Sequence, residues 1–328
     1  MRRARIAAMA AVVAVGVAAC AGGGGGDGGA DGSDDGLTEV RVGVLPVANM
    51  APLYLGIEEG YFEEEGLAVE PVVSQGGASI VPSVVSGDFQ IGYGNPVSIM
   101  QARDRGLDIR IVSGSTQGGA DAQTSGNGLL VAPDSGIEEV QDLAGKTIAV
   151  TTLSNAGELT TRAALEAEGV DSSTVEFVEL PFPEMNHAVM SGSVDVAWQA
   201  EPFVTLGEDE GMVNIVDPYV ATMDHLDAAV YFASGDLVES DPELVAAFQR
   251  ALTRSMERAR QDEDLTRETV LSFTEIEEDV ARRMVLAVYS RSVNLESIEL
   301  QADLALEYGL VENEVDVDAL LADGATGE

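Results

Sequence analysis

The chain has 328 residues, of which 57 are acidic and 17 are basic, and its formal net charge is −40. Such a charge repels nucleic acid and anionic membrane surfaces, so we expect neither of them as a binding partner. Apolar residues make up 45% of the chain and the acidic residues are scattered among periodic segments, so the sequence is expected to fold.

Residues 1–19 are typical of a signal peptide, because three arginines precede an apolar stretch that is too short to span a bilayer. The only cysteine, Cys20, follows the small residues Ala18 and Ala19. This segment resembles the lipobox of bacterial lipoproteins, which implies cleavage before Cys20 and a lipid on its thiol. The alternative is an ordinary secretory signal with an incidental cysteine. With no second cysteine, we expect no disulfide within the chain.

Residues 20–37 are predicted to be a flexible tether between the lipidated cysteine and the folded part. Most of them are Gly, Asp, Ala or Ser, which offer little apolar surface to bury. A Gly-rich chain of this length reaches roughly 20 to 25 Å on average. A phosphate-binding loop is not expected, because no strand precedes the glycines and no helix follows them.

The first part of the folded chain predicts alternating strands and helices. Strands are expected at 40–45, 67–73 and 89–93, and helices at 49–60, from 76 onward and at 96–105. Asn49 and Asn95 occupy expected N-cap positions, with Pro52 and Pro96 in the first turns. This order predicts a mainly parallel sheet with helices on its faces.

A second α/β unit is expected to follow. Strands are expected at 146–150, 175–180, 194–198 and 230–233, and helices at 155–168, at 184–190, from 241 onward and over most of 265–321. Asn155 and Glu158 have the spacing of a capping box, and Glu201 precedes Pro202 as a further cap. In the helix that begins at Asp241, the apolar positions are 244, 245, 248, 252 and 256.

Short strings of residues occur in a fixed order along the chain after the tether. They include Pro52-Leu53-Tyr54-Leu55, Glu59-Gly60-Tyr61-Phe62, Gly76-Gly77-Ala78, Ser86-Gly87-Asp88-Phe89, Asp142-Leu143-Ala144-Gly145-Lys146 and Glu201-Pro202-Phe203. Their order resembles that of the nitrate, sulfonate, taurine and thiamine-precursor binding proteins of ABC importers. The resemblance covers nearly all of the mature chain.

The resemblance implies an α/β, type II periplasmic-binding-protein-like fold, with two lobes, a hinge and a ligand cleft between them. It implies that 38–128 and 229–328 form one lobe and that 129–228 form the other, with chain crossings near 128–132 and 228–233. The expected function is capture of a small organic solute outside the cytoplasm and its delivery to ABC permease and ATPase subunits. We expect a lipid-anchored monomer on the outer face of the cell membrane, with no cofactor and no metal.

The candidate ligand site follows from the fold, because open α/β sheets bind ligands at the carboxyl ends of their strands, next to helix N-termini. The candidate residues in those loops are Asn49, Met50, Gly77, Ala78, Ser79, Tyr93, Asn95, Thr152, Ser154, Asn155, Trp198 and Glu201. The loops contain no Arg or Lys, which disfavours a multivalent anion and leaves a sulfonate, a carboxylate or a heteroaromatic such as a pyrimidine. Structural interpretations are equally open: the asparagines suit N-caps, Trp198 suits a core, and Glu201 suits a cap.

Two alternatives to transport are open at this point. A ligand-sensing lipoprotein would use the same cleft to report a solute. Pyrimidine synthases resemble this fold as well, but they use a reactive histidine and a cysteine-rich iron motif. This chain has His187 and His225 without metal-ligand spacing, and it has no Gly-x-Ser-x-Gly or His-Glu-x-x-His motif. We therefore expect no catalysis.

Overall fold

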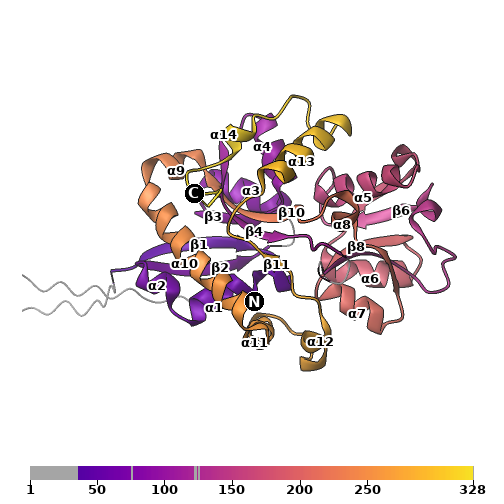
Figure 1. Ribbon diagram of the computed structural model, residues 1–328, viewed down its shortest axis with the longest axis horizontal. Helices are drawn as coiled ribbons and strands as arrows, with labels where there is room; N and C mark the ends of the chain where they lie inside the picture. The colour runs from indigo at the N-terminus through magenta and orange to yellow at the C-terminus, as the bar shows by residue number, and fades with distance from the viewer. Residues whose placement is uncertain (1–35, 75–76, 122–123, 125, 328) are drawn as a thin grey trace, which may run out of the picture. The chain divides into compact units, whose positions relative to one another are not determined.

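The computed structural model describes residues 36–74, 77–121, 124 and 126–327. The predictions for the signal peptide, for Cys20 and for most of the tether fall on residues 1–35 and lie outside this part. Within it, the strands form two sheets, each accompanied by helices (Figure 1). The α/β class predicted from the sequence is confirmed.

The first sheet takes strands from both ends of the described chain. In the order β11-β4-β10-β3-β1-β2, β1 pairs in parallel with β2 and β3, whereas β10 is antiparallel to β3 and β4, and β11 is antiparallel to β4. The bounds of these strands are β1 (Thr38–Val44), β2 (Leu67–Val73), β3 (Ile91–Gly94), β4 (Ile109–Gln117), β10 (Asp227–Ser234) and β11 (Val288–Tyr289).

The second sheet comes from the middle of the chain. Its strands lie in the order β7 (Glu176–Glu179), β6 (Thr147–Val150), β8 (Val196–Ala200), β5 (Asn127–Val131) and β9 (Val213–Val216). β6 is parallel to β7 and β8, while β5 is antiparallel to β8 and β9. The prediction of a mainly parallel sheet is wrong, because β5 and β10, which follow the two passages between the sheets, each enter antiparallel to their neighbours.

The chain passes between the two sheets twice, once between β4 and β5 and once between β9 and β10. The positions expected for these crossings, 128–132 and 228–233, fall largely within β5 and β10 themselves. The apolar runs Leu129-Leu130-Val131 and Val230-Tyr231-Phe232 are fully buried. Such runs are typical of central strands, which explains why the crossings lie before them.

The helices of the first sheet include α10 (Pro242–Gln261), the longest of the described chain. Asp241 caps it by accepting a hydrogen bond from the Leu244 N–H at 3.1 Å. Its predicted apolar positions, 244, 245, 248, 252 and 256, are all buried, so the helical pattern is confirmed. The other helices are α1 (Ala51–Glu58), α2 (Tyr61–Glu64), α3 (Gly77–Ser86), α4 (Pro96–Asp104), α9 (Gly235–Ser240), α11 (Glu263–Phe273), α12 (Glu278–Arg283), α13 (Leu295–Glu307) and α14 (Val317–Leu320).

The helices of the second sheet come from the middle of the described chain. They are α5 (Ala156–Ala167), α6 (Phe182–Met190), α7 (Phe203–Asp209) and α8 (Pro218–Thr222), with the 3₁₀ turns η2 (Val140–Leu143) and η3 (Ser172–Thr174). None of the helices in the described ranges combines the length and the apolarity that a membrane crossing requires.

Asparagine caps are confirmed at two of the three expected positions. The Asn95 Oδ1 accepts from the Ser98 N–H at 3.0 Å, and the Asn155 Oδ1 accepts from the Gly157 N–H at 3.1 Å. The cap expected at Asn49 is wrong, because the 3₁₀ turn η1 (Ala48–Met50) precedes α1 and Met50 takes the N-cap position. Pro52 then lies in the first turn of α1, where its missing N–H has no helical partner to lose.

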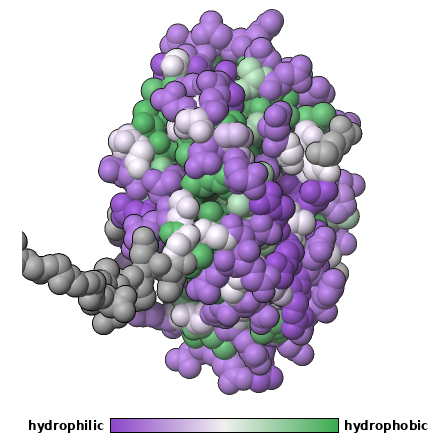
Figure 2. Space-filling view, turned by 90° about the vertical axis from the view of Figure 1, so that its left-hand side faces the viewer, coloured by the Kyte–Doolittle hydropathy of each residue, from purple (hydrophilic) through white to green (hydrophobic). Residues whose placement is uncertain are grey.

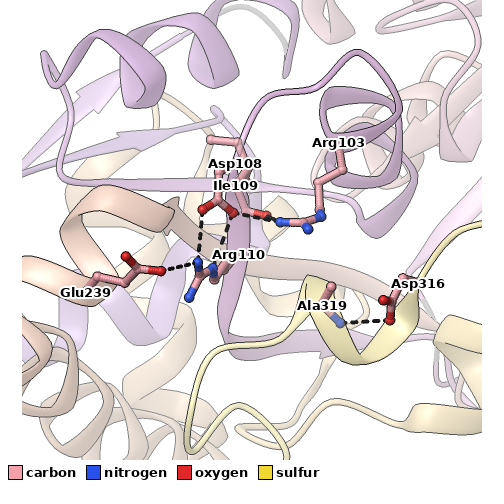
Figure 3. A network of polar contacts seen from close by, with 7 residues as sticks. All are labelled: Arg103, Asp108, Ile109, Arg110, Glu239, Asp316 and Ala319. Carbon is pink, nitrogen blue, oxygen red and sulfur yellow. Dashed lines mark hydrogen bonds and ion pairs between the residues drawn. The ribbon is translucent and has the colours of Figure 1, made fainter.

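A network of charged side chains holds α9 against β4. The Arg110 guanidinium donates to Asp108 at 2.9 Å and to Glu239 of α9 at 2.6 Å, and Arg103 of α4 donates to Asp108 at 2.7 Å (Figure 3). The hydrogen bond from Arg110, with help from Arg103, holds the pKa of the Asp108 carboxyl below its usual range.

The surface carries apolar residues only in scattered places on the face shown in Figure 2, where hydrophilic residues predominate. Exposed large apolar side chains of the described chain are spread over several elements, among them Val73 on β2, Met190 on α6 and Val213 on β9. Scattered residues of this kind are normal for a protein surface and need no partner to explain them.

Candidate functional site

A cavity of about 60 Å³ has a lining drawn from both sheets. Leu45 follows β1 and Gly94 ends β3, while Thr151 follows β6 and Ala200 ends β8. The carboxyl ends of strands from the two sheets therefore face one space, as the rule for open α/β sheets predicts. The helices α4 and α5 begin at the same place, since their caps Asn95 and Asn155 are part of the lining.

The polar part of the lining consists of amide and hydroxyl side chains. Besides the hydroxyls of Tyr93 and Tyr219, they are Asn49, Asn95, Asn127, Thr151 and Asn155. Asn95 and Asn155 use their Oδ1 atoms as helix caps, so their amide nitrogens can donate to a ligand while the caps stay in place. The N-termini of α4 and α5 add a partial positive potential at the cavity.

The lining includes the aromatic rings of Tyr93, Phe182, Trp198 and Tyr219 beside aliphatic side chains. Phe182 and Trp198 stack with 6.0 Å between ring centroids, and Tyr219 lies 5.8 Å from Trp198. Trp198 is 6% exposed, and its indole N–H has no hydrogen-bond acceptor among the described residues. A buried N–H in this position calls for a partner, which an acceptor atom of a ligand can supply.

Two tyrosines of the lining present neutral hydroxyl groups. Burial raises the pKa of Tyr93 to about 12, against the lowering effect of Thr116 and Asn49. Burial also raises the pKa of Tyr219, whose hydroxyl donates to the Ala228 carbonyl at 3.4 Å. Both groups therefore stay protonated near neutral pH.

Glu201 directly follows the cavity-lining residue Ala200. Its carboxylate accepts hydrogen bonds from other residues of the protein. Its Oε1 accepts from the Val285 N–H at 3.0 Å and from the Thr205 hydroxyl at 2.8 Å, and its Oε2 accepts from the Thr205 N–H at 3.1 Å. Glu201 is 2% exposed, and burial raises its pKa. The bond to the Thr205 N–H also helps cap α7, whose N-cap residue is Pro202.

Five of the residues predicted for the site line this cavity. They are Asn49, Tyr93, Asn95, Asn155 and Trp198. Of the other predicted residues, those whose side chains the structure describes lie outside the lining: Met50, Ser79, Thr152, Ser154 and Glu201. The side-chain surroundings of Gly77 and Ala78 fall outside what the structure describes. No charged side chain of the described residues belongs to the lining, in agreement with the lack of Arg and Lys in the predicted loops.

The residues outside the lining have other positions in the fold. Met50 is fully buried in the core, and α3, which begins at Gly77, follows the edge strand β2 rather than a central strand. Ser154 adopts a left-handed conformation with φ 56°, and its carbonyl accepts from the side-chain amide of Gln101. The Thr152 hydroxyl is buried beside it without a partner among the described residues.

Three polar lining residues were not among the predicted ones. Asn127 begins β5, which the sequence analysis assigned to a crossing, and Thr151 lies just before the predicted Thr152. Tyr219 lies in the first turn of α8, whose N-cap residue Asp217 accepts a hydrogen bond from the Tyr219 N–H at 2.9 Å. The pair Asp217-Pro218 is a helix-start signal, so Tyr219 could have been found in the sequence.

The two histidines lie on different elements of the fold. His187 is on α6, and His225 is in the loop before β10 with φ 56°. Across residues 36–74, 77–121, 124 and 126–327, no group of three or more His, Cys, Asp or Glu residues could hold a metal ion.

Two sheets with a cavity at their strand ends define a periplasmic-binding-protein fold. The alkanesulfonate-binding protein SsuA of Xanthomonas axonopodis pv. citri has this fold with a TM-score of 0.74 at 16% identity, over 86% of this chain and 97% of that one. The profile described as NMT1/THI5 like matches residues 47–264, so the chain belongs to the NMT1/THI5-like family. The suspected family and fold are confirmed.

This chain matches only part of the length of its named relatives. The taurine-binding periplasmic protein of Escherichia coli is 28% identical over 193 residues, which are 58% of this chain and 57% of that protein. The formylaminopyrimidine-binding protein of Halalkalibacterium halodurans is 26% identical over 225 residues, which are 67% of this chain and 65% of that protein. The chain thus spans a little over half to about two thirds of the length of these relatives.

Proposed function

We propose that this protein is the extracytoplasmic solute-binding component of an ABC importer and acts as a monomer with permease and ATPase subunits as partners. The observation that carries the proposal is the cavity at the strand ends of both sheets, lined by neutral donors and aromatic rings. Membership in the family and the printed names of the two relatives support a solute-binding function.

We propose that two lobes close around the solute. One lobe corresponds to the expected residues 38–128 and 229–328, and the other to the expected residues 129–228. The proposed lobe boundaries differ slightly from these and lie in the passages between β4 and β5 and between β9 and β10. These passages would act as the hinge. Contacts between the lobes support a closed form, since the Gln101 amide donates to the Ser154 carbonyl and the Tyr308 hydroxyl donates to Glu166 at 3.1 Å.

The proposed solute is a small molecule rich in hydrogen-bond acceptors, such as a sulfonate, a carboxylate or a pyrimidine. Asn95, Asn155 and Trp198 offer N–H donors to it, and the rings of Phe182 and Tyr219 offer apolar contact. Binding without catalysis is proposed, because the lining residues of the described chain include no side chain that titrates near neutral pH.

We also propose that a lipid on Cys20 anchors the protein to the outer face of the cell membrane. Support comes from the lipobox-like segment, which lies outside the described residues. Cys20→Ser should release the protein from the membrane fraction. Processed protein that stays there in wild-type amount contradicts the anchor and leaves the solute site unaffected.

A thermal-shift screen of the full-length protein against sulfonates, nitrate, amino acids, pyrimidines and flavins tests the solute-binding function. A solute at 100 times its Kd stabilises the folded state by about 2.7 kcal/mol, which raises the melting temperature by several degrees. A screen in which no member raises it contradicts the proposed solute classes. Adjacent genes for a permease and an ATPase support import, whereas an adjacent kinase or cyclase gene favours sensing.

A further inference from the structure

Buried charged residues of the described chain gather beside the solute cavity, and all of them are acidic. Each lies one or two positions along the chain from a residue of the lining, yet none belongs to the lining itself. They are Glu158, Glu201, Asp217 and Asp227. The contacts of their carboxylates decide whether the cavity can accept a positively charged group.

The two glutamates use both of their oxygens within the protein. The Glu158 Oε1 accepts from the Arg162 guanidinium at 2.7 and 3.0 Å, and its Oε2 accepts from the Ser154 N–H at 2.9 Å. The carboxylate of Glu201 accepts from the Val285 N–H and from the N–H and hydroxyl of Thr205. Neither carboxylate can turn to a solute without giving up these donors.

The two aspartates also bind donors of the protein. The Asp217 Oδ1 caps α8 by accepting from two N–H groups of its first turn, at 2.9 and 3.2 Å. The Asp227 Oδ1 accepts from the Gln117 amide at 3.1 Å, and its Oδ2 accepts from the Asn294 N–H at 2.8 Å. Four carboxylates thus come close to the cavity along the chain, and each of them serves the fold.

The residues between the described ranges offer no further carboxylate. They are Gln75, Gly76, Ala122, Gln123 and Ser125. None of these is acidic, so no carboxylate for a cationic group comes from the segments that interrupt the described chain.

Positive partial charges meet at the cavity instead. Asn95 and Asn155 line it and cap α4 and α5, and Ala156 and Gly157 of the lining are the first two residues of α5. A helix N-terminus carries a partial positive charge, which attracts anions and repels cations. Trp198 adds a buried indole N–H that has no acceptor among the described residues.

We propose that the solute carries no cationic group, so that the cavity selects anionic or neutral acceptor-rich compounds and excludes those with an ammonium group, such as amino acids and aminosulfonates. The inference rests on the proposed solute-binding function and narrows it. An ammonium group in this cavity would lose its water, face the positive ends of α4 and α5, and find no carboxylate among the described lining residues. Burial of an unpaired charge is strongly unfavourable.

Calorimetric titration of the full-length protein near neutral pH with three pairs of compounds tests the inference. The pairs are 1-propanesulfonate and taurine, butyrate and β-alanine, and 5-ethyluracil and 5-(aminomethyl)uracil. Within each pair an ammonium group replaces a methyl group of similar size. In every pair that binds, the methyl compound should bind at least about 10-fold more tightly. A smaller or reversed preference overturns the inference.

Asn95→Asp separates the effect of charge from that of apolar contact. The variant keeps the cap of α4 and places a carboxylate at the cavity, so it should reduce the preference for the methyl compound at least about 10-fold. A preference that comes from apolar contact alone would stay unchanged.

Gln261→Glu is the matched control, because it adds the same charge at an exposed position at the end of α10, outside the lining. It should keep the wild-type preference. An unchanged preference in Asn95→Asp, or an equal fall in both variants, overturns the inference. Lack of binding of all six compounds by the wild type overturns the proposed solute classes together with it, whereas tight binding of an ammonium compound overturns the inference alone.

Discussion

The guanidinium of Arg283 on α12 meets the carboxylate of Asp209 on α7 in a two-bond ion pair, with Nη1–Oδ1 and Nη2–Oδ2 distances of 2.8 and 2.7 Å. The helix α12 accompanies the first sheet and α7 the second, so the pair links the two proposed lobes. Two residues after Arg283, the Val285 N–H donates to the carboxylate of Glu201, which directly follows strand β8 of the second sheet.

Arg283→Gln should shift the ligand-free protein toward a more open form. The two side chains are 44% and 41% exposed, so solvent screens the pair. An ion pair screened in this way contributes little, so the ratio of closed to open molecules should change only by a few-fold. Small-angle scattering should show a larger radius of gyration. Arg282→Gln is the control, since Arg282 pairs with Glu278 of its own helix. Identical scattering of both variants and the wild type rules out the link.

Glu201→Gln should lower stability and leave solute affinity nearly unchanged. Three donors use the carboxylate, and an amide in its place presents an N–H group to at least one of them. The free energy of unfolding should fall by about 1 to 3 kcal/mol in urea denaturation. The dissociation constant should change less than about 3-fold in calorimetry, because this side chain lies outside the cavity lining. A large loss of affinity at unchanged stability places Glu201 in the site.

Asn95→Asp separates the cap of α4 from contact with the solute. Aspartate caps helices as well as asparagine does, so the melting temperature should stay within a degree or two of the wild type. The variant loses the amide donor and adds a negative charge beside the solute, so affinity for an acceptor-rich solute should fall at least about 10-fold. Asn95→Ala should lose both affinity and stability. Unchanged affinity in both variants shows that Asn95 only caps the helix.

Asp227 predicts a pH dependence of stability. It is 1% exposed, and burial raises its pKa from 3.8 to about 6, although Gln117 and the Asn294 N–H donate to its oxygens at 3.1 and 2.8 Å. Between about pH 4 and pH 6 the folded state keeps a proton that the unfolded state has lost. Stability from this group therefore falls as the pH rises through that window, by about 3 kcal/mol in total.

The measurement is urea unfolding of the wild type and of Asp227→Asn at a series of pH values. The variant loses one acceptor at every pH, which gives a constant offset. The difference between wild type and variant should change by about 2 kcal/mol from pH 4 to pH 6.5 and become nearly constant above about pH 7. A difference that is constant across the range shows that the Asp227 carboxyl titrates normally.

Local signals in the sequence account for the parts of the fold that were predicted. The caps at Asn95, Asn155 and Asp241 act within three residues, and the buried positions of α10 repeat with the helical period. The strand β4 was missed because its residues Ser113-Gly114-Ser115 lack the apolar and β-branched side chains that mark a strand. The strand β5 was missed because a short apolar run does not show which sheet it joins.

The candidate site was harder to predict, because side-chain direction depends on contacts far apart in the sequence. Glu201 lies at a strand end, where the rule for α/β sheets places ligands, yet its carboxylate turns to Val285, 84 residues further along the chain. Ser79 lies in the first turn of a helix that follows a strand, but that strand is at the edge of its sheet. Tyr219 reaches the cavity from a short helix within the second passage between the sheets.

The fluorescence of Trp198, the only tryptophan of the chain, tests the central claim most directly. Its indole ring lines the cavity proposed to hold the solute. A solute identified by thermal shift should change the Trp198 emission in a saturable way, with the same dissociation constant as calorimetry reports for the full-length protein. Calorimetric binding of that solute with unchanged Trp198 emission would contradict the claim, because it would place the solute away from the cavity between the sheets.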